Sequence, residues 1–143
     1  MRFLVDQEVA TDPGSAFDAM ADVRNEPRWN DQVSRSELVS SGSIAMGSRF
    51  KTVNRGYEYD AVITTYERPS RLEFEVTGRQ LDMSVSFRFE ASGANRTRMH
   101  SEFDMRPKGV LKLFFPLMTP LVRRDVPKQI AGFKRLFEGR PDR

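Results

Sequence analysis

Cysteine is absent from this chain of 143 residues, and histidine occurs once, as His100. Without cysteine the protein has no disulfide, no thiolate nucleophile and no cysteine-based metal site. A single histidine likewise excludes a histidine-rich metal centre. We therefore expect the protein to work without a metal or another cofactor.

Long apolar runs are also absent. The longest one, residues 110–122, has 13 positions and includes one lysine, one threonine and two prolines. A helix that crosses a bilayer needs about 20 mainly apolar residues. The first residues show no signal-peptide pattern, because Asp6 and Glu8 follow a very short apolar run. We expect a cytoplasmic protein.

The composition is that of a globular protein, with 38% hydrophobic and 30% charged residues. A chain of this length usually forms one domain and buries about two-thirds of its unfolded surface. We expect a single domain over residues 1–143. Eleven phenylalanines and seven methionines predict a core of large, deformable side chains.

Positive charge is concentrated at the C-terminal end. Residues 106–143 hold ten Lys/Arg and three Asp/Glu, whereas residues 1–105 hold 13 and 17. Such a segment is most often the solvated face of a helix, although an acidic partner, a membrane surface or nucleic acid also fits. No nucleic-acid recognition motif accompanies the charge, so we expect no nucleic-acid partner.

Most of the chain has the alternating pattern of half-buried strands. Between 81 and 91, apolar residues such as Met83, Val85 and Phe87 alternate with polar ones, and 96–106 behaves similarly. Turn residues separate the segments. Strands are predicted at 2–10, 33–40, 48–54, 57–67, 71–77, 81–91 and 96–106. The pattern predicts an antiparallel sheet with one buried face.

Two helical regions complete the pattern. Asp12 and Pro13 open a short helix over 13–22, which a turn through Pro27 follows. A long helix is predicted over 108–138, because apolar residues recur there at intervals of four or three. They are Val122, Val126, Ile130, Phe133 and Phe137. Its prolines leave two alternatives: a single bent helix, which we favour, or two helices over 109–115 and 120–138.

Five short motifs follow one another along the chain. They are Asp12-Pro13 before Ala16-Phe17, Asp22 to Trp29-Asn30 through Pro27, Gly47-Ser48-Arg49, Tyr66 to Leu72, and Ile130 to Glu138. In this order they resemble the START-like helix-grip (SRPBCC) superfamily of polyketide cyclases/dehydrases and lipid-transport proteins, over essentially the whole chain. The resemblance implies that this α+β chain forms a seven-stranded curved antiparallel sheet wrapped around a long C-terminal helix. One or two short helices are expected between strands 1 and 2.

The resemblance also implies a hydrophobic cavity, since members of the superfamily bind or carry hydrophobic small molecules. Residues predicted to face the space between sheet and helix are Phe74, Met83, Val85, Phe87, Met99, Ser101 and Phe103 from the strands, and Phe114, Met118 and Val122 from the helix. Trp29 is placed at the rim and Tyr59 is a further candidate. Each of these side chains alone also fits an ordinary packed core.

The sequence offers no catalytic constellation. His100 alternates with the inward residues of its strand and has Arg98 and Glu102 beside it, so we expect it on the wet face. No pair of carboxylates has a spacing that indicates a desolvated acid–base couple. We predict no catalytic residue.

The favoured hypothesis is a module that binds, and in one version transports, a hydrophobic or amphipathic small molecule or lipid. The rival is an enzyme of the cyclase/dehydrase or hydrolase kind that uses Tyr59, Ser101 or Arg49 in the same cavity. A third is a fully packed domain that works through its surface.

A membrane contact is a further possibility for the C-terminal helix. Leu113, Leu117 and Leu121 lie close to lysines and arginines, which suits transient docking on a lipid surface. Core packing or a dimer contact explains these leucines equally well. The oligomeric state stays open.

Overall fold

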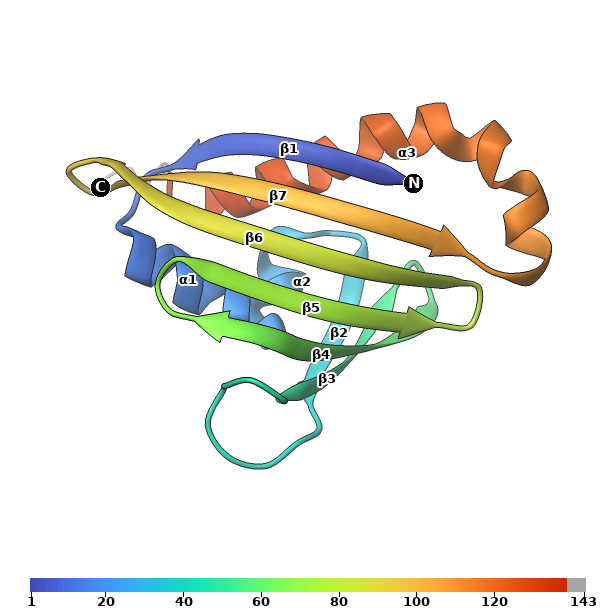
Figure 1. Ribbon diagram of the computed structural model, residues 1–143, viewed down its shortest axis with the longest axis horizontal. Helices are drawn as coiled ribbons and strands as arrows, with labels where there is room; N and C mark the ends of the chain where they lie inside the picture. The colour runs from blue at the N-terminus through green and yellow to red at the C-terminus, as the bar shows by residue number, and fades with distance from the viewer. Residues whose placement is uncertain (139–143) are drawn as a thin grey trace.

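The computed structural model describes residues 1–138. Its seven strands form one antiparallel sheet in the order β1-β7-β6-β5-β4-β3-β2 (Figure 1). The strands are β1 (Arg2–Val9), β2 (Val33–Leu38), β3 (Arg49–Asn54), β4 (Tyr57–Glu67), β5 (Arg71–Gly78), β6 (Leu81–Gly93) and β7 (Arg96–Pro107). Strands β2 to β7 pair with their neighbours in sequence because short turns connect most of them. The predicted sheet is confirmed.

The register of the sheet carries the predicted alternation across neighbouring strands. Val85 pairs with Phe103, and Met83 pairs with Met105, between β6 and β7. On the other side of β6, Val85 pairs with Phe74 of β5. Side chains of paired residues point to the same face of a sheet. The apolar residues of three strands therefore share one face, which is turned toward the last helix.

Two short helices and one 3₁₀ turn connect β1 to β2. Helix α1 (Pro13–Ala21) begins where the Asp12 carboxylate accepts a hydrogen bond from the Ser15 amide at 3.1 Å, and it buries Phe17 against the sheet. The 3₁₀ turn η1 (Val23–Asn25) follows, and α2 (Glu26–Trp29) comes directly after it. Two short helices agree with the prediction.

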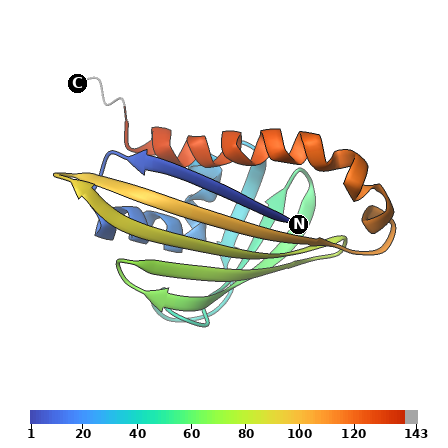
Figure 2. The same cartoon turned by 45° about the horizontal axis from the view of Figure 1, so that its top comes forward.

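Helix α3 (Gly109–Leu136) is one continuous helix that contains Pro116, Pro120 and Pro127. Figure 2 shows it running alongside the sheet, with a bend close to its N-terminal end. Proline removes a backbone donor and bends a helix without necessarily ending it. The favoured single bent helix is confirmed, and the alternative of two separate helices is wrong.

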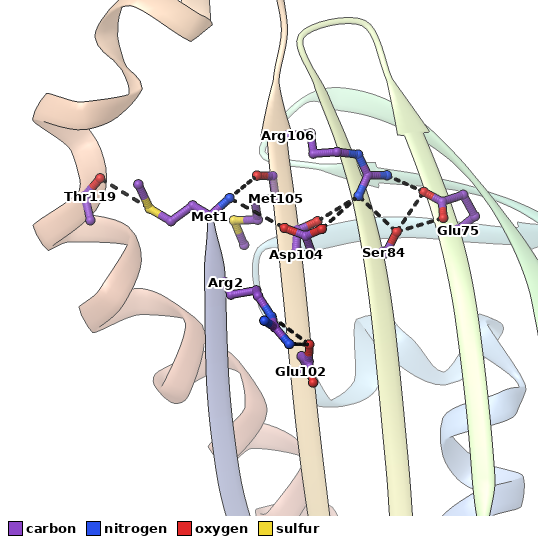
Figure 3. A network of polar contacts seen from close by, with 9 residues as sticks. All are labelled: Met1, Arg2, Glu75, Ser84, Glu102, Asp104, Met105, Arg106 and Thr119. Carbon is purple, nitrogen blue, oxygen red and sulfur yellow. Dashed lines mark hydrogen bonds and ion pairs between the residues drawn. The ribbon is translucent and has the colours of Figure 1, made fainter.

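The outer face of the sheet is polar and charged. The amino group of Met1 donates to the Met105 carbonyl at 2.8 Å, and Arg106 contacts Asp104 at 3.3 Å and also pairs with Glu75 (Figure 3). His100 also lies on this face, with Nδ1 at 2.9 Å from a carboxylate oxygen of Asp6. Exposed pairs of this kind contribute about 0–1 kcal/mol each. They identify the wet side of the sheet, where His100 was expected.

Candidate functional site

A cavity of about 440 Å³ lies between the sheet and α3. Its walls come from β3 to β7 on one side and from α3 on the other, and the segment from the end of α1 to α2 closes one end. Along α3 the apolar residues that line it are spaced by four or three positions: Leu111, Phe115, Met118, Val122, Val126 and Ile130. This spacing places them on one face of the helix. The sheet and the helix therefore enclose a mostly apolar space.

Most of the residues predicted to face this space do line it. They are Trp29, Tyr59, Phe74, Met83, Val85, Phe87, Phe103, Met118 and Val122. The rings of Phe74 and Phe87 meet edge to face at 6.3 Å, and those of Phe87 and Phe103 at 6.1 Å. Edge-to-face contacts hold aromatic rings in defined positions. The three rings thus form one continuous aromatic wall of the cavity.

Three of the predicted residues lie elsewhere. Met99 is fully buried but does not line the cavity, because it pairs with Phe89 where α1 covers the sheet. Ser101 is also buried, outside the lining, and its hydroxyl has no hydrogen-bond partner within residues 1–138. Phe114 is 53% exposed. A step of one residue turns a helix by about 100°, so Phe115 faces inward and Phe114 does not.

The cavity has a polar end that the sequence patterns did not reveal. Glu26 of α2 and Asn30, which directly follows α2, line it, and Gln129 lines it from α3. Charged and amide residues in a short turn resemble ordinary surface residues, which explains why they were missed. One signal was present: Glu26 and Asn30 are four positions apart, the spacing that places two side chains on one side of a helical turn.

Asn30 contacts both Glu26 and Gln129. The Asn30 side-chain amide donates to the Gln129 side-chain oxygen at 3.3 Å and to the Glu26 carboxylate at 3.5 Å. The Asn30 side-chain oxygen accepts from the Gln32 amide at 3.1 Å, which fixes the orientation of the group. Burial raises the pKa of Glu26 to about 7, and the hydrogen bond from Asn30 offsets this only in part.

The other charged side chains of the cavity lining are already paired. Asp22 contacts Arg24 at 2.8 Å, and Asp125 contacts Arg55 at 3.1 Å. Hydrogen bonds from these arginines hold the pKa of both aspartates below the usual value. Within residues 1–138, no basic side chain comes within 4.0 Å of the Glu26 carboxylate. Among residues 1–138, Glu26 is therefore the only charged residue of the cavity lining without an ionic partner.

Two glycines allow side chains of the site to take their positions. A Cβ on Gly132 of α3 would lie 1.9 Å from the Trp29 carbonyl oxygen, so only glycine lets α3 approach α2 this closely. The Trp29 ring then meets Phe133 edge to face at 5.4 Å. A Cβ on Gly78 would lie 2.5 Å from the Tyr59 ring. Burial raises the pKa of Tyr59, so its hydroxyl is a neutral group in the lining.

A second hollow, a groove of about 530 Å³, lies next to the polar end on the surface. It shares Trp29, Asn30, Arg55, Asp125 and Gln129 with the cavity lining. The cavity and the groove thus adjoin at these residues. Arg28, Lys128 and Arg135 line the groove but not the cavity.

The outward side of α3 is apolar in its first half. Large exposed side chains there are Val110, Leu113, Phe114, Leu117 and Leu121, of which Leu113 is 77% and Leu117 78% exposed. Within residues 1–138, no helix has both the length and the apolar character needed to cross a membrane. Over 108–124 the chain has basic residues and no acidic one.

Comparison with known proteins identifies the family. Residues 2–138 match the family described as polyketide cyclase / dehydrase and lipid transport. The chain belongs to this family. Its fold is the helix-grip fold of START-like domains, and no curated protein matches it by sequence.

Solved structures share the fold at low sequence identity. A START superfamily protein from Mycobacterium smegmatis is 14% identical with a TM-score of 0.75, and the match covers 97% of this chain and 95% of that one. TTHA0849 from Thermus thermophilus is 14% identical with a TM-score of 0.74, covering 94% and 95%. The di-domain ARO/CYC BexL from the BE-7585A biosynthetic pathway is 15% identical with a TM-score of 0.74, covering 94% of this chain and 45% of that one.

Proposed function

We propose that this START-like domain binds a hydrophobic or amphipathic small molecule in the cavity between the sheet and α3. The observation that carries the proposal is a cavity of about 440 Å³ with mostly apolar walls and a polar group at one end. Small-molecule sites have volumes of about 300–1,000 Å³ and the same mixture of apolar walls and few polar groups. The family description, with cyclases, dehydrases and lipid transport together, supports a hydrophobic ligand.

Native mass spectrometry of the purified protein tests this proposal. We expect a bound molecule, or a stoichiometric complex after decanol is added. The substitution Val85→Phe fills part of the cavity, because Val85 lines it and is only 7% exposed. Val39→Phe is the matched control, since Val39 is 54% exposed and outside the lining. Equal decanol affinity of the two variants would contradict binding in the cavity.

The proposal includes transfer of the ligand at a membrane surface, on the cytoplasmic side. The exposed apolar side chains of α3 suit contact with lipid, and the anionic cytoplasmic leaflet attracts nearby Lys and Arg by about 1 kcal/mol each. Lys112 forms no ion pair within residues 1–138, whereas Lys108 contacts Asp82 at 2.9 Å. We expect co-sedimentation with phosphatidylserine-containing vesicles and much less with phosphatidylcholine vesicles. Sedimentation velocity separates this from the dimer alternative, which requires a concentration-dependent increase in mass.

Catalysis in the same cavity is the second candidate function. Of the three residues considered for it, only Tyr59 lines the cavity, because Arg49 is exposed and Ser101 lies outside the lining. The observation in its favour is Glu26, whose pKa of about 7 suits a general acid or base. If a molecule that copurifies with the protein is converted on incubation, and Glu26→Gln stops the conversion, catalysis is supported. An unchanged molecule supports binding alone.

A further inference from the structure

The charged groups that line the cavity differ in whether they have an ionic partner. Asp22, Arg55 and Asp125 each have an ionic partner within 3.1 Å, whereas Glu26 has only the side-chain amide of Asn30 at 3.5 Å. A carboxylate in apolar surroundings loses its hydration and gains stability when a cation takes the place of water. The structure thus contains an anionic group in the cavity wall whose partner is not supplied by residues 1–138.

We propose that Glu26 binds the basic amine of an amphipathic ligand whose apolar part occupies the rest of the cavity. This inference rests on the proposed function and adds the chemical class of the ligand. An alkylammonium group supplies a positive charge and up to three hydrogen-bond donors. A carboxylate ligand would be repelled by ionised Glu26, and an alcohol could donate only one hydrogen bond to it and would bring no positive charge.

Neighbouring groups favour this arrangement. Asn30 is oriented by Gln32 and Gln129, and its contact with Glu26 is long, so the carboxylate oxygens retain capacity for a stronger donor. The side-chain oxygen of Gln129 and the Tyr59 hydroxyl are further acceptors in the lining. The cationic groups Arg28, Lys128 and Arg135 line the outer groove instead of the cavity.

The proposal predicts how affinity depends on pH. Other titratable or charged lining residues are Asp22, Arg55, Tyr57, Tyr59 and Asp125. The two aspartates have lowered pKa values and Tyr59 a raised one, so their charges stay constant between pH 6 and 8. Guanidinium and phenol groups in general titrate above this range. His100 lies on the outer face, paired with Asp6 and Glu90.

Isothermal titration calorimetry with decylamine, decanol and decanoate at pH 6 and pH 8 tests the inference. Burial sets the pKa of Glu26 at about 7, so its ionised fraction rises about tenfold over this range, from about 0.1 to about 0.9. We expect decylamine to bind about tenfold more tightly at pH 8 than at pH 6. Decanoate should change in the opposite direction, and decanol should change least.

Two variants complete the experiment. Glu26→Gln keeps the size of the side chain and removes its charge, so it should abolish the pH dependence of decylamine binding. Glu67→Gln, the same change at an exposed position outside the lining, should retain it. A pH dependence that persists in Glu26→Gln, or is missing in the unmodified protein, overturns the inference. If decanol also fails to bind, the proposed function falls; if decanol binds, only the amine assignment falls.

Discussion

The first half of α3 (109–122) is richer in apolar residues than the second half (123–136), and the two halves also have different surroundings. In the second half, Val126, Ile130 and Phe133 are buried against the sheet and α2. In the first half, one apolar row lines the cavity, and a second row, which includes Leu113 and Leu117, is exposed. The burial of an apolar side chain depends on a facing partner and not on its own hydrophobicity. The second half is therefore mainly packed against other elements, although Val126 and Ile130 also line the cavity, and the first half has an additional exposed apolar row.

The same substitution, phenylalanine to alanine, made once in each half of α3 should give the largest difference in the free energy of unfolding. Phe133→Ala removes a fully buried ring that contacts Trp29 and Phe137, and we expect it to lower the free energy of unfolding by about 4 kcal/mol. Phe114→Ala removes a ring that is 53% exposed, and should cost about 0.5 kcal/mol. Urea denaturation measures both. Equal losses would show that the first half also stabilises the fold.

Gly132→Ala tests the close packing of the second half against α2. The added Cβ would meet the Trp29 carbonyl oxygen, so we expect a loss of about 2 kcal/mol and a changed emission of the single tryptophan. Gly14→Ala is the control, because its Cβ would meet the flexible end of the Arg68 side chain at 2.9 Å. If both variants are equally stable, α3 does not require glycine at this position.

Glu26→Gln sharpens the comparison at the polar end of the cavity. Burial raises the pKa of Glu26 from 4.5 to about 7, so the folded state binds more protons than the unfolded state between these values. The stabilisation from a protonated Glu26 is fully present below pH 4.5 and is lost as the pH rises through 7. The stability difference between the two proteins should thus shift in favour of the variant by on the order of 2 kcal/mol between pH 5 and pH 8. Urea denaturation at the two pH values measures this, and a constant difference between the proteins would contradict it.

Leu117→Ser should have the smallest effect on stability, within about 0.5 kcal/mol, because Leu117 is 78% exposed. We expect it to reduce co-sedimentation with phosphatidylserine vesicles several-fold, since the side chain belongs to the exposed row of α3. Leu4→Ser is the matched control on the sheet, where Leu4 is 73% exposed. Equal loss of vesicle binding in both variants would remove α3 as the contact.

Much of the fold could be predicted because it depends on local patterns. Alternation along β6 and β7 requires one buried and one wet face, and the spacing of Val122, Val126 and Ile130 requires a helix with a buried side. The orientation of Phe114 could not be predicted in this way. The first half of α3 carries apolar residues on more than one of its own sides. Their spacing is therefore compatible with more than one inward face.

The cavity itself was only partly predictable. Phe87 and Phe103 lie on the inward face by alternation, whereas Met99 shares that alternation and is covered by α1. The polar end was missed because Glu26 lies in a helix of four residues, which is too short for a periodic pattern.

The sequence alone determined the order of the elements, the inward face of the long strands and the helical nature of the last third, because each follows from the repeat of apolar residues along the chain. Only the tertiary structure decided which apolar side chains have a partner and which carboxylate of the cavity lining has no ionic partner within residues 1–138. Those outcomes depend on contacts between α2, α3 and the sheet, and these segments are distant in sequence. Distance and burial, which set the pKa of Glu26, arise only when those segments meet.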